Sequence, residues 1–322
     1  MINSYCPKVS IVIPVRKVND YIHESIPHIL NLDYQNFEIL IFPDGDSGKQ
    51  FERCRVIPTG PVGPAEKRDL ALKYAEGDIL AFLDDDAYPR SDWLTKAVKH
   101  FENPQVAAVG GPAVTPPSDS LWQRASGAVF ESKLGGGKFT YRYAPGPMQE
   151  VDDFPSVNLL VRKEDFSQIG GFDSHYWPGE DTKLCHDLVY KLGKKIIYDP
   201  DVLVWHHRRN LFRPHFEQIK NYALHRGFFA KRLPRTSLKL AYIAPSLFVM
   251  GLLFGPIVCY FFPSLWPVWW FTVLGYLGAV TLSVFRLKDF RLSVLTGLGI
   301  MMTHVGYGTY FILGLFKKEL VR

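Results

Sequence analysis

Two long stretches without charged residues occupy most of the C-terminal part of this 322-residue chain. Residues 240–285 contain no Asp, Glu, Lys or Arg, and a second uncharged stretch covers 292–316. A helix that crosses the hydrocarbon core of a membrane needs about 20 apolar residues, so the first stretch is long enough for two crossings and the second for one. We therefore expect a membrane domain over 239–322. Its expected hydrophobic segments are about 240–262, 265–285 and 292–316.

Basic residues flank these segments and predict their orientation. The two clusters are Lys231, Arg232, Arg235 and Lys239 before the first segment, and Arg286, Lys288 and Arg291 after the second. Because Lys and Arg favour the cytoplasmic side, we expect a multi-pass protein of the inner (plasma) membrane with its N-terminal domain in the cytoplasm. Three full crossings would place Lys317, Lys318 and Arg322 outside, against that tendency. The last segment is therefore expected either to cross, to re-enter the membrane or to lie along its interface.

Composition argues against several other classes of protein. The N-terminus lacks the basic start and long apolar stretch of a signal peptide. Four scattered cysteines without CxxC spacing support neither a zinc site nor a disulfide framework. The formal charge of +5 is explained largely by the basic residues around the tail, so no nucleic-acid partner is expected.

The N-terminal part alternates strand-like and helix-like patterns. The predicted strands are 9–15, 37–46, which ends in a polar turn, and 78–86. The predicted helices are 21–32, 63–75 and 91–101, the last with Ser91 or Asp92 near its N-cap. This alternation implies right-handed crossovers and an α/β fold, with a mostly parallel sheet covered by helices on both faces. Ligands of such sheets gather beyond the carboxyl ends of the strands.

Acidic residues stand at two of these strand ends. Asp84, Asp85 and Asp86 follow one predicted strand, and Asp44 follows another. Neighbouring carboxylates repel each other unless a cation, hydrogen-bond donors or water offset the charge. A solvated turn that caps the next helix would relieve the repulsion. A hard divalent cation bound to carboxylates and substrate phosphates would do so too, and the shared edge favours the cation.

The ordered motifs resemble glycosyltransferase family 2, which has the Rossmann-like GT-A fold. They are VSIVIPV at 9–15, Asp44, KRDLA at 67–71, LDDDAYP at 83–89 and GGFDSHYWPGEDTKLCHDL at 170–188. The resemblance covers roughly residues 8–210 and is specific as a set, although each motif alone would be weak. It implies a GT-A catalytic domain over 1–213, of the membrane-attached bacterial or archaeal type that makes polysaccharides or lipid-linked glycans.

The resemblance also implies how a nucleotide-diphosphate sugar would be bound. The implied donor-binding residues are Pro14, Val15, Asp44, Arg68, Asp84 and Asp85. Pro43 stands where the family commonly has a second aspartate, which leaves the base open; a UDP-sugar is favoured, and GDP- and dTDP-sugars are the other candidates. Alternatively, Asp44 is a simple turn residue of PDGD, and Lys67 and Arg68 form an exposed helix face.

The implied cofactor is Mg²⁺ or Mn²⁺, held by Asp86 with either His206 or His207. Asp181 would be the catalytic base of an inverting transfer, taking the proton from the acceptor hydroxyl, and Glu180 would orient the acceptor or support Asp181. The alternatives are an ordinary acidic first turn of a helix for the Glu–Asp pair and a basic surface patch for the histidines.

The last motifs concern the acceptor and the membrane. Residues that could meet the diphosphate of a lipid-linked acceptor are Arg208, Arg209, Arg213 and Arg226. Residues 214–238 are predicted to form a basic amphipathic helix and linker at the membrane interface. The sequence thus predicts an inverting, metal-assisted transferase that adds one sugar to a lipid-linked glycan at the cytoplasmic face. A polyprenyl-phosphate sugar synthase and an inactive nucleotide-sugar-binding scaffold are the alternatives.

Overall fold

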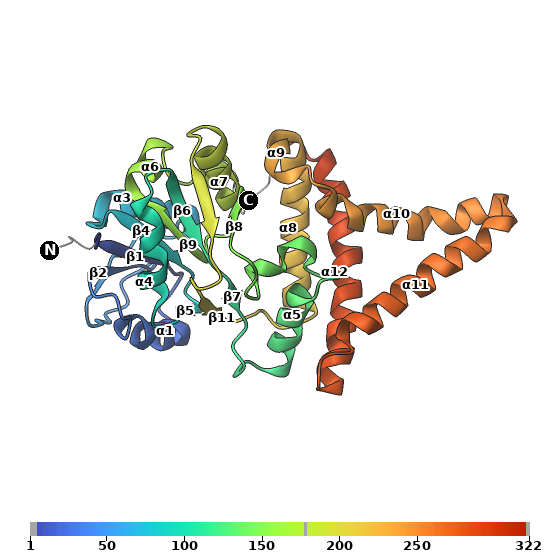
Figure 1. Cartoon of the computed structure of the whole chain (residues 1–322), viewed down its shortest axis with the longest axis horizontal. Coiled ribbons are helices and arrows are strands. Elements are labelled where there is room, and N and C mark those ends of the chain that lie inside the picture. The colour runs from blue at the N-terminus through green and yellow to red at the C-terminus, as the bar shows by residue number, and fades with distance from the viewer. Residues whose placement is uncertain (1–4, 177–178, 320–322) are drawn as a thin grey trace. The chain divides into compact units, whose positions relative to one another are not determined.

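The computed structural model describes residues 5–176 and 179–319 (Figure 1). Two parts of the predictions lie outside the described residues, namely Arg322 and the Trp177–Pro178 step of the acidic motif. Contacts divide the chain into two compact units. Unit 1 consists of Met1–Val114 and Ala144–His207, and unit 2 of Thr115–Tyr143 and Arg208–Arg322.

Unit 1 contains a mostly parallel sheet. Its strands, in spatial order, are β3 (Cys54–Val56), β2 (Phe37–Phe42), β1 (Val9–Pro14), β4 (Ile79–Leu83), β9 (Asn158–Arg162), β6 (Val106–Gly110), β10 (Lys195–Tyr198) and β8 (Gln149–Val151). Strand β9 runs antiparallel to β4 and β6, β8 runs antiparallel to β10, and the other pairs are parallel. The predicted α/β class is confirmed.

Helices cover both faces of this sheet. They are α1 (Asp20–Leu30), α2 (Pro64–Asp69), α3 (Ala71–Tyr74), α4 (Trp93–Val98), α6 (Lys163–Gln168) and α7 (Glu180–Tyr190). Alternate residues of β1 pack with Ile22 and Ile26 of α1 and with Trp93 of α4. On the other face, the ring of Phe82 in β4 lies 5.4 Å from that of Phe166 in α6. Side chains that alternate along each strand therefore form two apolar layers.

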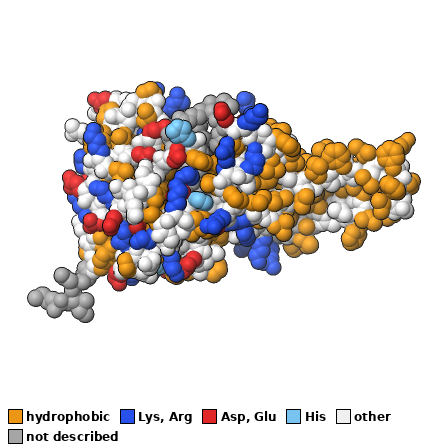
Figure 2. Space-filling model, turned by 90° about the horizontal axis from the view of Figure 1, so that it is seen from above, with side chains coloured by type: hydrophobic (Ala, Val, Ile, Leu, Met, Phe, Trp, Pro, Cys, Tyr) orange, Lys and Arg blue, Asp and Glu red, His pale blue; other side chains and the backbone are white. Residues whose placement is uncertain are grey.

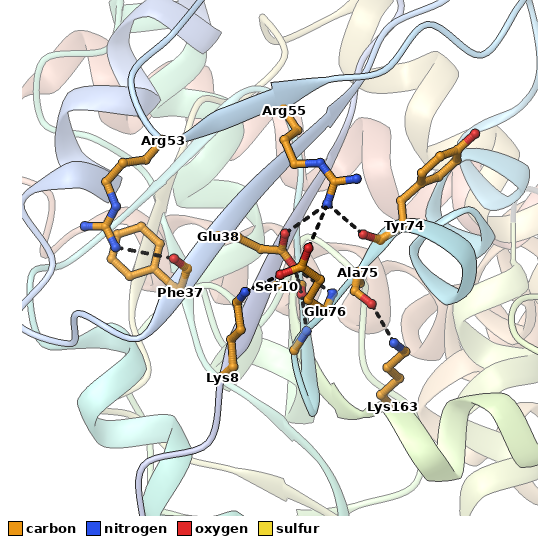
Figure 3. A network of polar contacts seen from close by, with 11 residues as sticks. Lys8, Ser10, Phe37, Glu38, Arg53, Arg55, Tyr74, Ala75, Glu76 and Lys163 are labelled. Carbon is orange, nitrogen blue, oxygen red and sulfur yellow. Dashed lines mark hydrogen bonds and ion pairs between the residues drawn. The ribbon is translucent and has the colours of Figure 1, made fainter.

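A polar network joins the amino ends of the strands (Figure 3). The buried Ser10 hydroxyl donates to Glu38 Oε1 at 2.7 Å and accepts from the Gly77 amide at 2.9 Å. The other carboxylate oxygen of Glu38 pairs with Arg55 at 3.3 Å. These bonds fix one edge of the sheet and lie at the opposite ends of the strands from the acidic run.

A small second sheet in unit 1 has the order β5 (Ala87–Pro89), β11 (Val204–His206), β7 (Ala113–Val114). Strand β11 is antiparallel to β5, with His206 opposite Ala87. The pairing therefore places His206 next to the acidic run that precedes β5, although His206 follows Asp86 by 120 positions in the chain.

Unit 2 is helical. Its helices are α5 (Leu121–Glu131), α8 (Arg213–Arg232), α9 (Pro234–Ser237), α10 (Leu240–Phe261), α11 (Trp266–Val284) and α12 (Phe290–Phe316). Within residues 5–176 and 179–319, three helical segments are long and apolar enough to cross a membrane: Leu240–Phe261, Pro263–Val284 and Phe290–Phe316. They agree with the predicted segments to within a few residues.

The segment 115–143 groups with the tail, although the predicted catalytic domain over 1–213 included it. The apolar face of α5 packs on the tail helices, where Ala125 and Val129 share a cluster with Leu211 and Ile300. The amphipathic pattern of α5 predicts that one of its faces is buried. It does not predict whether that face packs on the sheet or on the tail helices.

Candidate active site

Strands β1, β2 and β4 end at one edge of the sheet. Val9 pairs with both Phe37 and Ile79, so the three strands run in register. Pro14, the last residue of β1, and Val15 therefore lie at the same edge as Asp44 and Asp84, which follow β2 and β4. The predicted donor-binding residues of these strands come from one side of the fold.

Two carboxylates and an imidazole gather beyond β4. Each of Asp84, Asp86 and His206 offers one ligand atom, and these atoms lie within 4.8 Å of one another. His206 Nε2 lies 3.1 Å from Asp86 Oδ1. Carboxylate oxygens with one imidazole nitrogen form a donor set that suits Mn²⁺ or Mg²⁺. The residues present therefore fit the implied metal.

The neighbouring His207 has different contacts. Its Nε2 lies 2.9 Å from Glu24 Oε2, and its ring stacks on Tyr21 with centroids 4.8 Å apart. Its backbone amide donates to the carbonyl of Asp86 at 3.0 Å. Successive side chains of an extended segment point in opposite directions, which explains why only His206 joins the cluster.

Arg68 connects the acidic run to the predicted catalytic pair. Its Nη2 donates to Asp84 Oδ1 at 2.7 Å, and its Nη1 donates to Glu180 Oε1 at 3.3 Å. Lys67 and Arg68 are only 3% and 4% exposed, so the alternative of an exposed helix face is wrong. Both ends of the Arg68 guanidinium thus bind carboxylates of the protein itself. This arrangement is suited to fixing the positions of Asp84 and Glu180.

Lys67 holds the other acidic strand end. Its Nζ donates to the carbonyl of Val15 at 2.6 Å and forms an ion pair with the Asp44 carboxylate. Arg16 approaches the second oxygen of Asp44, with Nε 3.9 Å from Oδ2. Sequence reasoning did not assign Lys67 a role, because a lysine on a short helix usually faces water.

The Glu180–Asp181 pair begins α7. Glu180 is 6% exposed, whereas Asp181 is partly exposed and accepts a hydrogen bond from the Thr182 amide at 2.7 Å. Burial and the neighbouring Asp181 carboxylate raise the pKa of Glu180, and Arg68 opposes the rise. Thr182 Oγ1 donates to the buried Asp153 at 2.9 Å, which anchors the start of the helix.

Asp85 points to a residue that sequence reasoning missed. Asn19 Nδ2 donates to Asp85 Oδ2 at 2.6 Å, while Asn19 Oδ1 caps α1 by accepting from the Ile22 amide at 3.1 Å. Burial, and then the adjacent Asp86, raise the pKa of Asp85 to about 6. An asparagine just before a predicted helix indicates an N-cap, so that role of Asn19 could have been predicted. Its hydrogen bond to Asp85 could not, because Asp85 is distant in the sequence.

The four predicted acceptor arginines belong to unit 2 and do not form one cluster. Arg208 is buried, donates from Nε to Thr115 Oγ1 at 3.2 Å and lies over a tyrosine ring, whereas Arg209 and Arg213 are exposed. Arg226 lies further along α8, and its guanidinium is 4.5 Å from the centroid of the Tyr242 ring. Arg213 and Arg226 are about 20 Å apart along α8, so we do not expect one diphosphate to bind both.

A family model decides the family. The model described as glycosyl transferase family 2 matches residues 10–170, which is half of the chain and contains β1 from Ser10 onward, β4 and the acidic run. The chain belongs to glycosyl transferase family 2. The match ends before α7 and β11, so the family model itself does not cover Glu180, Asp181 or His206.

Curated relatives of this family 2 member differ in length. It is 34% identical to a pre-mycofactocin glycosyltransferase of Mycobacterium tuberculosis over 152 residues, 47% of this chain but 31% of that protein. It is 24% identical, over 70% of this chain and 74% of the relative, to a dolichyl N-acetyl-alpha-D-glucosaminyl phosphate 3-beta-D-2,3-diacetamido-2,3-dideoxy-beta-D-glucuronosyltransferase of Methanococcus voltae. The match therefore spans about a third of the mycobacterial protein.

A solved structure supports the fold over the full length. The mannosyltransferase PcManGT of Pyrobaculum calidifontis, in complex with GDP-Man and Mn²⁺, superposes with a TM-score of 0.56 and 20% sequence identity. The superposition covers 98% of this chain and 89% of the mannosyltransferase. The predicted GT-A fold is thereby confirmed.

Proposed function

We propose that this protein is a membrane-attached inverting glycosyltransferase. It would transfer one sugar from a nucleotide-diphosphate donor to a lipid-linked glycan at the cytoplasmic face of the membrane. The observation that carries the proposal is the chain of contacts from the Asp84–Asp86–His206 cluster through Arg68 to Glu180. This chain joins a metal-type donor set to a carboxylate pair at a helix start, as a metal-assisted transfer with a general base requires.

The roles follow from charge and exposure. Asp84, Asp86 and His206 would hold Mg²⁺ or Mn²⁺, which when bound supplies positive charge for the departing diphosphate. Asp181 is the more exposed member of its pair, so it can reach an acceptor hydroxyl and take the proton as that oxygen attacks. Glu180 is buried against Arg68 and would support Asp181 without contacting the acceptor.

The donor is proposed from the strand ends. Asp44 would contact the base, and the buried Lys67 holds its carboxylate in place before a ligand arrives. A UDP-sugar stays our first candidate. The neighbour PcManGT is described with GDP-Man, so a GDP-sugar belongs in the same test.

The acceptor is proposed from the relatives and the tail. Two archaeal relatives carry names that refer to dolichyl phosphate-linked sugars, and the chain has helices that are able to enter a membrane. Among the four predicted arginines, Arg226 faces Tyr242 at the start of the first apolar helix. We therefore assign Arg226 the first place as a partner for a lipid-linked diphosphate.

The test is turnover by the purified full-length protein with a panel of nucleotide sugars and a lipid-linked acceptor. Asp181→Asn should lower kcat by ~10²–10⁴-fold, because general base catalysis contributes that much, while donor binding stays intact. His206→Ala should weaken Mn²⁺-dependent donor binding by ~10–100-fold, in line with other losses at metal sites. His207→Ala is the matched control and should change that binding much less.

Two results would contradict the proposal. Near-normal turnover of Asp181→Asn with excess donor would remove the base and favour transfer to a lipid phosphate, whose oxygen is already ionised. Donor binding without any dependence on Mn²⁺ or Mg²⁺, together with no turnover for any donor in the panel, would favour an inactive sugar-nucleotide-binding scaffold.

A further inference from the structure

Helices α10 and α11 form a hairpin with an apolar surface. With 22 and 19 residues they are about 33 and 29 Å long, which matches a hydrocarbon core of about 30 Å. Large apolar side chains such as Phe254, Phe271 and Leu282 are exposed on it, and hydrophobic side chains cover this projection (Figure 2). Trp266 and Trp269 stand near its turn, where tryptophan suits the far membrane–water boundary.

Helix α12 runs across the base of this hairpin (Figure 1). Ser246, near the start of α10, donates to the carbonyl of Gly308 at 3.0 Å. Val280, near the end of α11, faces Gly297. These two contact points are 11 residues apart, or about 16 Å along α12. The proximal ends of α10 and α11 thus meet different parts of α12, and their turn projects away from it.

The basic helix α8 lies along the second half of α12. Contacts advance together along both helices: His215 with Thr303, Phe216 with Gly306, Gly227 with Gly314 and Lys231 with Lys317. The charged residues of α8 are Arg213, Glu217, Lys220, Arg226, Lys231 and Arg232. If α12 crossed the membrane, Glu217 and Lys220 would lie near the bilayer centre. A charged side chain there is unfavourable even on the lowest scales.

A polar, partly non-helical segment covers the middle of α12. Val129 of α5 packs at Gly299, and Ser126 Oγ lies 2.8 Å from Nδ1 of His215. His304 Nε2 lies 2.9 Å from the carbonyl oxygen of Leu134, which belongs to the glycine-rich stretch after α5. Irregular backbone is not found exposed to lipid in the hydrocarbon region. The middle of α12 therefore belongs at a depth where such backbone is tolerated.

One face of α12 is apolar and exposed. Its exposed large apolar residues are Phe290, Val294, Leu298, Val305, Leu313 and Phe316. At 100° per residue these fall within an arc of about 140°. A helix with one exposed apolar face and the basic helix α8 along another side is suited to the boundary between acyl chains and headgroups.

We infer that α12 lies along the cytoplasmic membrane interface and that the α10–α11 hairpin alone crosses the membrane. The inference rests on the membrane attachment proposed above. It places Arg286, Lys288, Arg291, Lys317 and Lys318 on one side, which removes the conflict with the positive-inside tendency that three crossings create.

The net positive charge of unit 2 indicates which kind of membrane surface it would bind. Unit 2 contains 19 Lys and Arg and 5 Asp and Glu, a formal +14, although the whole chain carries +5. Each Lys or Arg near an anionic membrane surface is attracted to it. The partner of the face formed by α8 and α12 is therefore a bilayer rich in anionic phospholipid.

Cysteine labelling of the full-length protein tests this topology. Ser264→Cys, Lys288→Cys and Lys318→Cys each place a thiol at an exposed position: the hairpin turn, the α11–α12 connection and the residues after α12. A membrane-impermeant maleimide is added to spheroplasts before or after permeabilisation. The parent protein keeps its four native cysteines, so the labelling of each variant is measured after the labelling of the parent protein is subtracted.

We expect Ser264→Cys to be labelled in intact spheroplasts, and Lys288→Cys and Lys318→Cys only after permeabilisation. Label on both Ser264→Cys and Lys318→Cys from outside would mean three crossings and overturn the inference. Protection of Ser264→Cys would overturn the crossing hairpin, and outside label on Lys288→Cys would overturn the cytoplasmic side. Labelling does not depend on sugar transfer, so an inactive enzyme with this labelling pattern would refute only the proposed function.

Discussion

Replacement of Arg68 tests the link between the acidic run and α7. Arg68→Met keeps most of the length of the side chain but removes the two bonds to Asp84 and Glu180. Asp84 has a side chain that is 32% exposed, so water can take the place of the lost partner. Glu180 has no such access and would be left as a buried charge without its cation.

The loss of stability should come mainly from Glu180. Removal of one partner of a buried ion pair costs about 3–5 kcal/mol, because the other charge stays desolvated. Since only one of the two carboxylates is fully buried, we take the lower end, about 3 kcal/mol. For a folded unit of this size that corresponds to a fall in Tm of ~6–12 °C.

The loss should also depend on pH. Burial and Asp181 raise the pKa of Glu180 in the folded protein, and removal of Arg68 raises it further. A carboxyl group with a raised folded pKa binds its proton more tightly in the folded state, so its contribution to stability falls as pH rises above the unfolded pKa of about 4.3. Arg68→Met should therefore lose more stability at pH 8 than at pH 5.

Thermal unfolding in detergent at pH 5 and pH 8 measures both effects. The matched control is the double variant Arg68→Met with Glu180→Gln, in which a neutral amide of the same shape replaces the buried charge. It should recover most of the Tm that the single variant loses at pH 8. An equal loss at both pH values, with no recovery in the double variant, would refute the role assigned to this ion pair.

Two further predictions concern stability outside the metal cluster. Burial raises the pKa of Asp69 to about 7. Because the folded state then binds this proton more tightly than the unfolded state, the free energy of unfolding should fall by up to about 4 kcal/mol between pH 4 and pH 7. Asp69→Asn should raise Tm at pH 8 and flatten the pH profile, and an unchanged profile would contradict this. Ser10→Ala leaves the buried Gly77 amide unpaired and should cost about 1–3 kcal/mol in thermal unfolding. Its initial transfer rate well below Tm should be unchanged, and a lower rate would contradict the placement of Ser10 away from the site.

Local pattern predicted the strands and helices of unit 1 well because each is short and strongly periodic. Residues 9–15 become β1 (Val9–Pro14), and the second predicted strand is β2 (Phe37–Phe42). The predicted helix over 63–75 instead breaks at Leu70 into α2 and α3. Asp92 occupies the N-cap position of α4, but its carboxylate pairs with Arg90 and makes no capping bond.

The part of the candidate site that depends on pairing between distant strands could not be predicted from the sequence. The acidic run was visible in the sequence, whereas the choice between His206 and His207 depends on how β11 pairs with β5. No local pattern contains that register. The two adjacent histidines carry the same side chain, and only the alternation of an extended strand separates their environments.

The consecutive cations of α2 show how one short helix organises the acidic edge. Lys67 and Arg68 are neighbours, so they point about 100° apart around the helix axis, and each reaches a different strand end. Lys67 pairs with Asp44 after β2, and Arg68 pairs with Asp84 after β4 and with Glu180. The protein therefore compensates most of its acidic edge from within, by buried groups that no ligand has to order. Asp84 and Asp86 each place a carboxylate oxygen in one cluster with the imidazole of His206, and a divalent cation bound there would add positive charge to this part of the edge.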